Sequence, residues 1–180
     1  MKVYEFFCLT YKVFYIISKD FIFRSKLNEL SLEIIDLEVI MDFIKDNDIY
    51  FIRLEKDEDL FSTLEEFAAE EKLLSAHISG IGALKDVELG FYHLDKKHYD
   101  RKVFPDEAEL LSLDGNLCVF ENKPFFHIHT VLGGADFNCY GGHLFSAKVA
   151  VTCEINLRPF NREITRIHNC DIGLNLLKLN

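Results

Sequence analysis

The chain has 180 residues, of which 49% are hydrophobic, and its 30 acidic and 20 basic side chains give a formal net charge of −10. A chain of this length suits one domain, or one domain with an appendage. The negative charge repels phosphate backbones, and no run of Lys and Arg marks a basic patch, so electrostatic attraction to nucleic acid is disfavoured.

The first 23 residues are rich in Phe, Tyr and Ile, as a targeting segment can be. Charged side chains, Glu5 and Lys12 among them, interrupt the apolar run, and no small-residue cleavage site follows. The segment therefore fits neither a membrane-spanning helix nor a secretion signal, and we expect a cytoplasmic protein without a membrane partner. The five cysteines are widely spaced and form no CxxC pair. We expect them to be small buried hydrophobic residues rather than zinc ligands or a redox-active dithiol.

Residues 24–48 carry an apolar stripe at helical spacing. Apolar side chains recur every three or four positions from Leu27 to Ile40, which predicts an amphipathic helix of about 18 residues. The stripe is expected to pack on the domain or on a partner.

The composition shifts near residue 48, and this divides the chain into an N-terminal extension, residues 1–48, and a domain, residues 49–180. The extension combines the aromatic segment with the predicted helix. An alternative is that residues 1–40 are not part of the working protein. Met41, just ahead of the first clear domain strand, would then be the true start.

From Tyr50 the chain alternates apolar and polar side chains in short runs, which is typical of strands. One helix is predicted at residues 57–72, where Asp57 or Asp59 can cap the start. Its inner stripe consists of Leu60, Leu64 and Phe67. Strands are expected at residues 50–55, 73–79, 84–94, 96–104, 107–115, 116–123, 124–132 and 144–157, with one or two more over 163–179.

Most of these strands are joined by short turns rather than helices, which predicts an α+β fold with a largely antiparallel sheet of at least seven strands. Two glycines, Gly80 and Gly82, predict a bulge or a close backbone approach. The run Asp114-Gly115-Asn116 predicts a hairpin turn.

Three histidines form the strongest chemical signal in the chain. His127 and His129 are two residues apart in a predicted strand, so they project from the same face. His143 follows a pair of glycines, and its strand can return beside the first. Three imidazoles meeting at one point suit Zn²⁺ or another divalent transition metal, with a coordination position left open as in catalytic sites. The alternative is a solvated or hydrogen-bonded strand face.

Glu154 is the acidic candidate to assist these histidines, because it lies on the long strand predicted after them. It can act as a fourth ligand, as a group that orients a ligand, or as a general base, and the spacing does not choose among these roles. His77 is placed where it can approach the site. His93 and His98 are expected on the surface, and His168 is expected to be structural.

Four blocks of sequence occur in a recognisable order. They are SGIGAL (79–84), LLSLDGNL (110–117), PFFHIHTVLGGADFNCYGGHL (124–144) and AVTCEI (150–155). Together they resemble the PPC domain, named for its presence in plants and prokaryotes, and the likeness covers roughly residues 49–178.

The resemblance implies an α+β fold in which a strongly bent, mostly antiparallel sheet of about seven strands packs against a helix. It also implies a homotrimer, and a metal bound by the histidines at 127, 129 and 143. The fold is similar to that of acetolactate decarboxylase, whose zinc is held by similarly placed histidines, but a likeness of fold assigns no substrate.

Three functions are compatible with this resemblance. The first is a homotrimeric metalloprotein that acts on or senses an unknown small molecule, with Glu154 assisting the metal and a pocket near Gly80, Gly82 and Gly142. Whether such a protein is an enzyme stays open. The second is a DNA-binding or regulatory interaction module, because plant relatives join this domain to an AT-hook. The chain has no R-G-R-P core, the AT-hook sequence that contacts DNA, and this disfavours direct DNA contact. The third is a trimeric assembly domain with neither activity.

Overall fold

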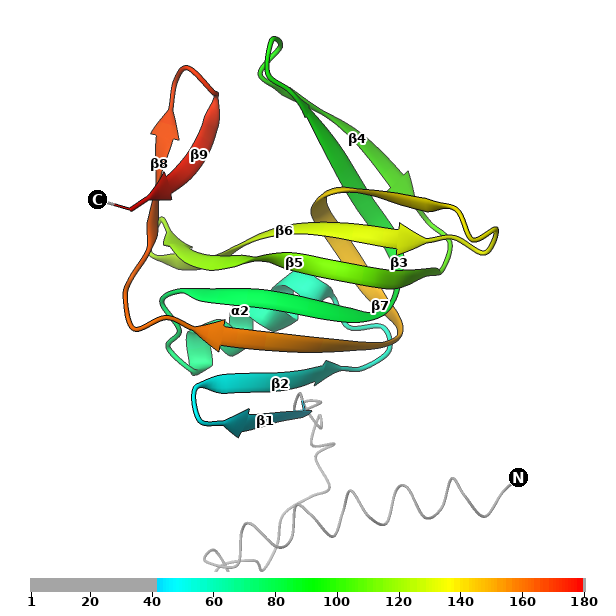
Figure 1. Ribbon diagram of the computed structural model, residues 1–180, viewed down its shortest axis with the longest axis horizontal. Coiled ribbons are helices and arrows are strands. Elements are labelled where there is room, and N and C mark those ends of the chain that lie inside the picture. The colour runs from blue at the N-terminus through cyan, green and yellow to red at the C-terminus, as the bar shows by residue number, and fades with distance from the viewer. Residues whose placement is uncertain (1–41, 180) are drawn as a thin grey trace, which may run out of the picture. The chain divides into compact units, whose positions relative to one another are not determined.

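The computed structural model describes residues 42–179 of the chain (Figure 1). Within this range the structure contains one α-helix, α2 (Leu60–Glu70), and nine β-strands. The strands are β1 (Asp42–Asp46), β2 (Ile49–Leu54), β3 (Ala76–His93), β4 (His98–Phe104), β5 (Ala108–Phe120), β6 (Lys123–Gly133), β7 (Cys139–Pro159), β8 (Thr165–Asn169) and β9 (Leu174–Lys178). The domain is mostly strand with one helix, as the sequence predicts. The helix predicted from Leu27 to Ile40 lies outside the described residues.

The nine strands form one mixed and strongly curved sheet (Figure 1). The strands β1, β2, β7, β3 and β5 follow one another as antiparallel neighbours, and β4 pairs with β3. β6 completes the curve, because it pairs with β5 on one side and with the start of β7 on the other. β5 meets β8 in a parallel contact between Val119 and Thr165. The long β7 therefore belongs to both halves of the curved sheet.

Helix α2 covers one face of the sheet (Figure 1). The carboxylate of Asp59, rather than that of Asp57, caps the helix by accepting a hydrogen bond of 3.0 Å from the backbone N–H of Ser62. The predicted inner stripe is confirmed, because Leu60, Leu64 and Phe67 are buried. Burying each such side chain contributes about 1.5–3 kcal/mol.

The predicted break at Asp114-Gly115-Asn116 is wrong, because β5 runs through this point without a turn. The chain turns instead at Glu121 and Asn122, whose φ angles of 51° and 62° suit a tight hairpin between β5 and β6. Glycine at 115 serves another purpose. A methyl group there would overlap the carbonyl oxygen of His127 on β6, so the glycine lets the two strands approach.

The two glycines of SGIGAL form the predicted irregularity within a strand. β3 runs from Ala76 to His93 as one element, where the sequence predicted two, and its pairing with β5 shifts register between Gly80 and Gly82. Added methyl groups at both positions would meet the backbone of β7. These glycines therefore allow close strand packing, and the pocket expected beside them is filled by the neighbouring strand.

Residues 42–46, which the sequence assigned to the extension, form β1 and pair with β2. The ring of Phe43 lies 5.1 Å from that of Phe67 and 6.0 Å from that of Tyr50, so β1 packs with the domain core. In the part of the chain from 42 to 179, no helix is long and apolar enough to cross a membrane.

The expectation of buried cysteines is met only in part. Cys118 and Cys153 are buried, whereas Cys139 and Cys170 are exposed, and all four are free thiols. Cys139 lies at the start of β7 and Cys170 in the turn between β8 and β9. Periodicity alone does not locate strand ends and turns, so the sequence did not distinguish these cysteines from the buried ones.

Candidate metal centre

β6 presents two histidines on one face of the sheet, as their spacing predicts. Phe126, Ile128 and Thr130 are buried on the core side, whereas His127 is half-buried and His129 exposed on the other side. The buried side chains hold the strand in place, so the two imidazoles project next to each other from the outer face. Their ring centroids are 5.1 Å apart.

The start of β7 brings the third histidine to the same place. β7 runs antiparallel to β6, and His143 lies directly opposite His129 in the pairing. His143 is also paired with Gly90 of β3 on its other side. A methyl group on Gly142 would lie 2.7 Å from the carbonyl oxygen of Gly90. The glycine before His143 therefore lets β7 pass between β6 and β3 at this point.

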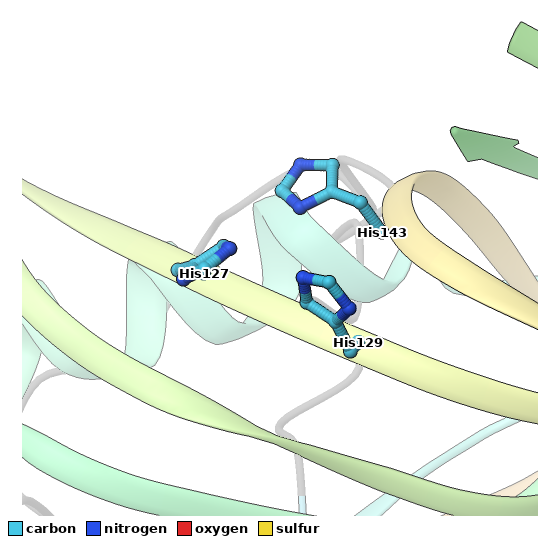
Figure 2. A group of neighbouring side chains, drawn as sticks. All are labelled: His127, His129 and His143. Carbon is cyan, nitrogen blue, oxygen red and sulfur yellow. The ribbon is translucent and has the colours of Figure 1, made fainter. Parts of the chain in front are cut away.

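The three imidazole rings converge. The centroid of the His143 ring lies 5.1 Å from that of His127 and 5.4 Å from that of His129. One nitrogen from each ring can be chosen so that all three lie within 4.8 Å of one another. Figure 2 shows the rings gathered around a common space between β6 and β7. Because zinc binds imidazole nitrogen at about 2.0–2.1 Å, small ring rotations would bring the three nitrogens to one ion.

Two further observations fit a metal at this point. Nδ1 of His143 is buried and has no hydrogen-bond partner within the described residues, which costs about 1–3 kcal/mol unless something binds it. Burial, followed by the charge of Arg166, lowers the pKa of His127 from 6.5 to about 4. Burial, followed by the rings of His127 and His129, lowers the pKa of His143 to about 4. Both rings are therefore neutral at pH 7, which is the form that binds a metal.

The model of the Plants and Prokaryotes Conserved (PCC) domain matches residues 41–161, which is more than half of the chain. The chain belongs to the PCC domain family. This is the PPC domain that the sequence blocks resemble, and the three converging histidines lie within the matched range. No curated protein matches the chain.

Several solved structures share the PCC fold. A metal-containing protein of Archaeoglobus fulgidus is 39% identical, with a TM-score of 0.69 over 76% of this chain and 96% of its own. A plant- and prokaryote-conserved (PPC) protein of Pyrococcus horikoshii is 28% identical, with a TM-score of 0.68 over 78% of this chain and 95% of its own. A candidate DNA-binding protein of Bacteroides thetaiotaomicron is 29% identical, with a TM-score of 0.74 over 77% of this chain and 96% of its own.

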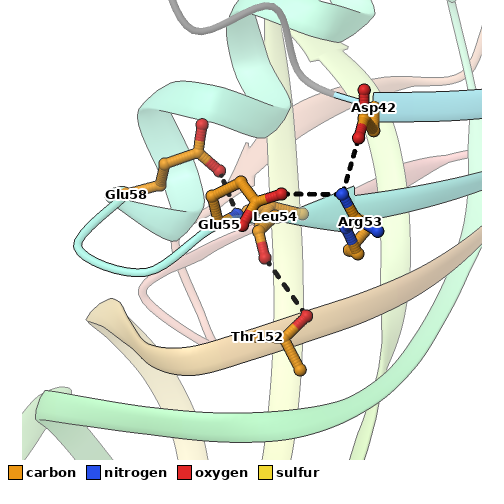
Figure 3. A network of polar contacts seen from close by, with 6 residues as sticks. All are labelled: Asp42, Arg53, Leu54, Glu55, Glu58 and Thr152. Atoms are coloured by element: carbon orange, nitrogen blue, oxygen red, sulfur yellow. Dashed lines mark hydrogen bonds and ion pairs between the residues drawn. The ribbon is translucent and has the colours of Figure 1, made fainter. Parts of the chain in front are cut away.

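The structure of this PCC domain does not bring Glu154 to the histidines. Glu154 lies in the later half of β7, between Arg53 of β2 and Ile81 of β3, and the strands β3 and β5 separate it from β6. Arg53 forms ion pairs with Asp42, at 2.6 Å, and with Glu55, at 2.8 Å (Figure 3). Glu154 lines a hollow of about 580 Å³ among β1, β2 and β7, and this hollow is separate from the histidine cluster.

The remaining histidines of the described chain lie outside the cluster. Exposed His77 contacts the carboxylate of Asp114 at 3.2 Å. His93, at 2.7 Å from a carboxylate oxygen of Asp100, and exposed His98 sit at the end of the β3–β4 hairpin. His168 of β8 lies 3.2 Å from the side-chain oxygen of Asn175, within the C-terminal hairpin.

Sequence reasoning missed the residues that surround the histidines. Tyr99 of β4 and Phe145 of β7 pack against the ring of His143, with centroid distances of 5.2 Å and 4.6 Å. Arg101 stacks over Phe145, and Arg166 of β8 donates a hydrogen bond to Asn116, the residue that pairs with His127. The period-two alternation after His143 indicates that Phe145 shares its face. The other three residues come from strands whose pairing the sequence does not specify.

Replacing Gly115 with alanine is expected to destabilise the PCC domain by about 1–3 kcal/mol, because the methyl group forces β5 away from β6 beneath His127. Urea unfolding of the variant measures this loss. Gly133→Ala is the matched control, since the atoms nearest to its methyl group would be side-chain carbons of Leu111, at 3.3 Å and beyond. Equal stability of the two variants would contradict the close approach of β5 and β6.

Without metal, the domain is expected to lose stability as the pH falls from about 6.5 to about 4. The folded-state pKa of His127 and of His143 is about 4, below the value of 6.5, so the unfolded chain binds more protons in this range. At pH 5 each histidine should cost about 1–2 kcal/mol of stability relative to pH 7. Urea unfolding in the presence of a chelator measures this. His143→Gln should show a smaller loss between pH 7 and pH 5, and an unchanged loss would contradict the burial of this ring.

Proposed function

We propose that this PCC-domain protein is a metalloprotein that holds one divalent transition metal on His127, His129 and His143. The observation that carries the proposal is the placement of one nitrogen from each ring within 4.8 Å of the others. The unpartnered Nδ1 of His143 supports it, as does the 39% identity to a metal-containing protein of Archaeoglobus fulgidus. Imidazole ligands suit zinc, and they also suit other borderline divalent ions.

The protein is proposed to act on or sense a small molecule at this centre. Three protein ligands leave a coordination position open, and a bound ion would supply Lewis acidity there. The chain contributes the walls of the site: Tyr99 and Phe145 pack against His143 and exclude water from that side. His129 is exposed, so the centre is accessible from the other side. With Glu154 lining a separate hollow, a carboxylate general base is not part of the proposal.

Metal content tests this proposal. Protein purified without affinity tags that leach metal, after growth in metal-replete medium, should contain about one transition-metal ion per chain by plasma mass spectrometry. Dialysis against a chelator should remove the ion, and added zinc should restore it. Metal-free protein that also fails to take up zinc would rule the proposal out.

A homotrimer is proposed on the basis of the family. The described chain exposes large apolar side chains on the strands of the sheet, with Phe51, Ile81 and Val151 each more than half exposed. Large exposed apolar side chains on a sheet are candidates for burial in an interface between copies of the chain. Light scattering should give a mass near 63 kDa, three times the chain mass of 20.9 kDa. A monomer at micromolar concentration would contradict the assembly.

A second candidate function is DNA binding. The observation that favours it is the description of two structural relatives, from Bacteroides thetaiotaomicron and Ralstonia eutropha, as candidate DNA-binding proteins. The net charge of −10 opposes it, because phosphate contacts provide most of the affinity of such proteins. A gel-shift assay at low salt decides the point: retention that weakens steeply with added salt supports direct contact, and no retention excludes it.

A further inference from the structure

Two arginines, on strands β8 and β4, contact residues that neighbour the histidine cluster. Arg166 lies on β8, and its Nη2 donates a hydrogen bond of 3.0 Å to the side-chain oxygen of Asn116. Asn116 is the residue of β5 that pairs with His127. Arg166 also packs over the ring of Phe125, which precedes His127 by two residues on β6. These contacts fix the guanidinium beside His127.

The charge of Arg166 has no acidic partner within residues 42–179. Besides Asn116, its donors meet the backbone oxygen of Asn175, at 2.7 Å, and the thiol of Cys118, at 3.1 Å. All of these acceptors are neutral, and the side chain is half-buried. A partly buried positive charge that lacks a counter-ion attracts an anion, because binding one offsets its desolvation.

Arg101 provides positive charge on the opposite side of the cluster. It lies on β4, opposite Gly90, and Gly90 is also paired with His143. Its guanidinium stacks 3.6 Å above the centre of the Phe145 ring, which itself contacts His143. Its ion pair with Glu88 is long, at 3.5 Å, and about half of the side chain is exposed. The guanidinium therefore keeps donors available for a ligand at the cluster.

We propose that the three-histidine centre binds a small oxyanion, such as a carboxylate or phosphate, and that Arg166 and Arg101 select it by charge. This inference rests on the proposed metal site. Guanidinium groups recognise carboxylate and phosphate by paired hydrogen bonds. Neutral imidazoles leave the charge of a divalent ion uncompensated, so ion and arginines favour the same kind of ligand.

The C-terminal hairpin, β8 and β9, carries Arg166 and would therefore help to set the specificity of the site. It begins after residue 161, beyond the range matched by the PCC model. Figure 1 shows it rising from the sheet on the same side as the β3–β4 hairpin. Tyr92 donates a hydrogen bond of 2.6 Å to the backbone oxygen of Ile172, and Lys97 donates one of 2.6 Å to that of Cys170. These bonds fasten the hairpin that carries Arg166.

Cobalt-substituted protein tests the inference, because the visible spectrum of Co²⁺ reports on ligands at its open position. Acetate and inorganic phosphate are titrated at low ionic strength, with acetamide as the neutral counterpart of acetate. Both anions should shift the spectrum with saturation, whereas acetamide should not. Arg166→Gln should raise the apparent Kd of each anion at least about tenfold, the effect of losing one charged hydrogen-bonding group. Arg101→Gln, at a more exposed position, should raise it about threefold to tenfold.

Arg162→Gln is the matched control, since it removes the same charge from an exposed position ahead of β8 and should leave both Kd values unchanged. Arg101→Gln keeps the test decisive if loss of Arg166 loosens the hairpin. Full cobalt uptake with unchanged anion affinity in both variants would overturn the selection by arginine but not the metal site. Failure of the wild-type protein to take up cobalt would overturn both. A preference for acetate over phosphate, or the reverse, identifies which oxyanion the site is built for.

Discussion

Replacing His129 with alanine is expected to lower the metal content of the purified protein from about one ion per chain to less than about a tenth of that. His129 is exposed, so its removal should leave the folded domain intact while it deletes one of three ligands. Loss of groups that only orient a ligand costs about 10–100-fold in metal affinity, and loss of a ligand itself should cost more. His127→Ala and His143→Ala should give the same result.

His168→Ala is the control for these variants, because His168 contacts Asn175 in the C-terminal hairpin and is not part of the cluster. It should retain the wild-type metal content. Thermal unfolding under chelator separates loss of metal from loss of fold. A His129→Ala protein that is folded and still holds a full complement of metal would show that the ion binds elsewhere.

Phe67→Ala is expected to lower the free energy of unfolding by about 3–5 kcal/mol. Phe67 is 2% exposed, and its ring meets those of Tyr50 and Phe43 edge-on at 5.2 Å and 5.1 Å. Truncation would leave a cavity between α2 and the sheet that the rigid strands cannot fill. Urea unfolding of metal-free protein at pH 7 measures the loss without a contribution from the metal.

Phe137→Ala provides the matched comparison, since Phe137 is 94% exposed and its truncation should change stability by less than about 0.5 kcal/mol. If both phenylalanine variants lose the same small amount of unfolding free energy, the result contradicts the packing of α2 on the sheet. If Phe67→Ala is the less stable by several kcal/mol, the helix is an essential part of the domain core.

The histidine cluster could be predicted because it depends on short-range rules. The side chains of His127 and His129 share a face by strand periodicity alone. Phe126 before them and Ile128 between them are buried, which confirms that the histidines point away from the core. His143 follows by a single reversal of the chain. Its exact place opposite His129 was not predictable, since the length of the connection does not fix the register of β7.

The wrong predictions and the missed residues concern relations between distant parts of the chain. Glu154 follows His143 on the same strand, but the curve of the sheet carries that half of β7 toward β2 and away from β6. Gly115 stands in a sequence typical of a turn and yet lies inside β5. A glycine is needed there because the backbone carbonyl oxygen of His127 comes close to it. Arg166 lies on a strand that meets β5 at a single parallel pair, a contact that local sequence patterns do not predict. The curvature of the sheet and the pairing of distant strands set these positions, and neither can be predicted from periodicity.

X-ray diffraction from crystals of metal-loaded protein, with data collected on both sides of the zinc absorption edge, decides whether the three histidines hold the ion. We expect an anomalous peak between β6 and β7 at about 2.0–2.1 Å from one nitrogen of each of His127, His129 and His143. A peak bound to other residues, or no peak in crystals grown with zinc, would contradict it.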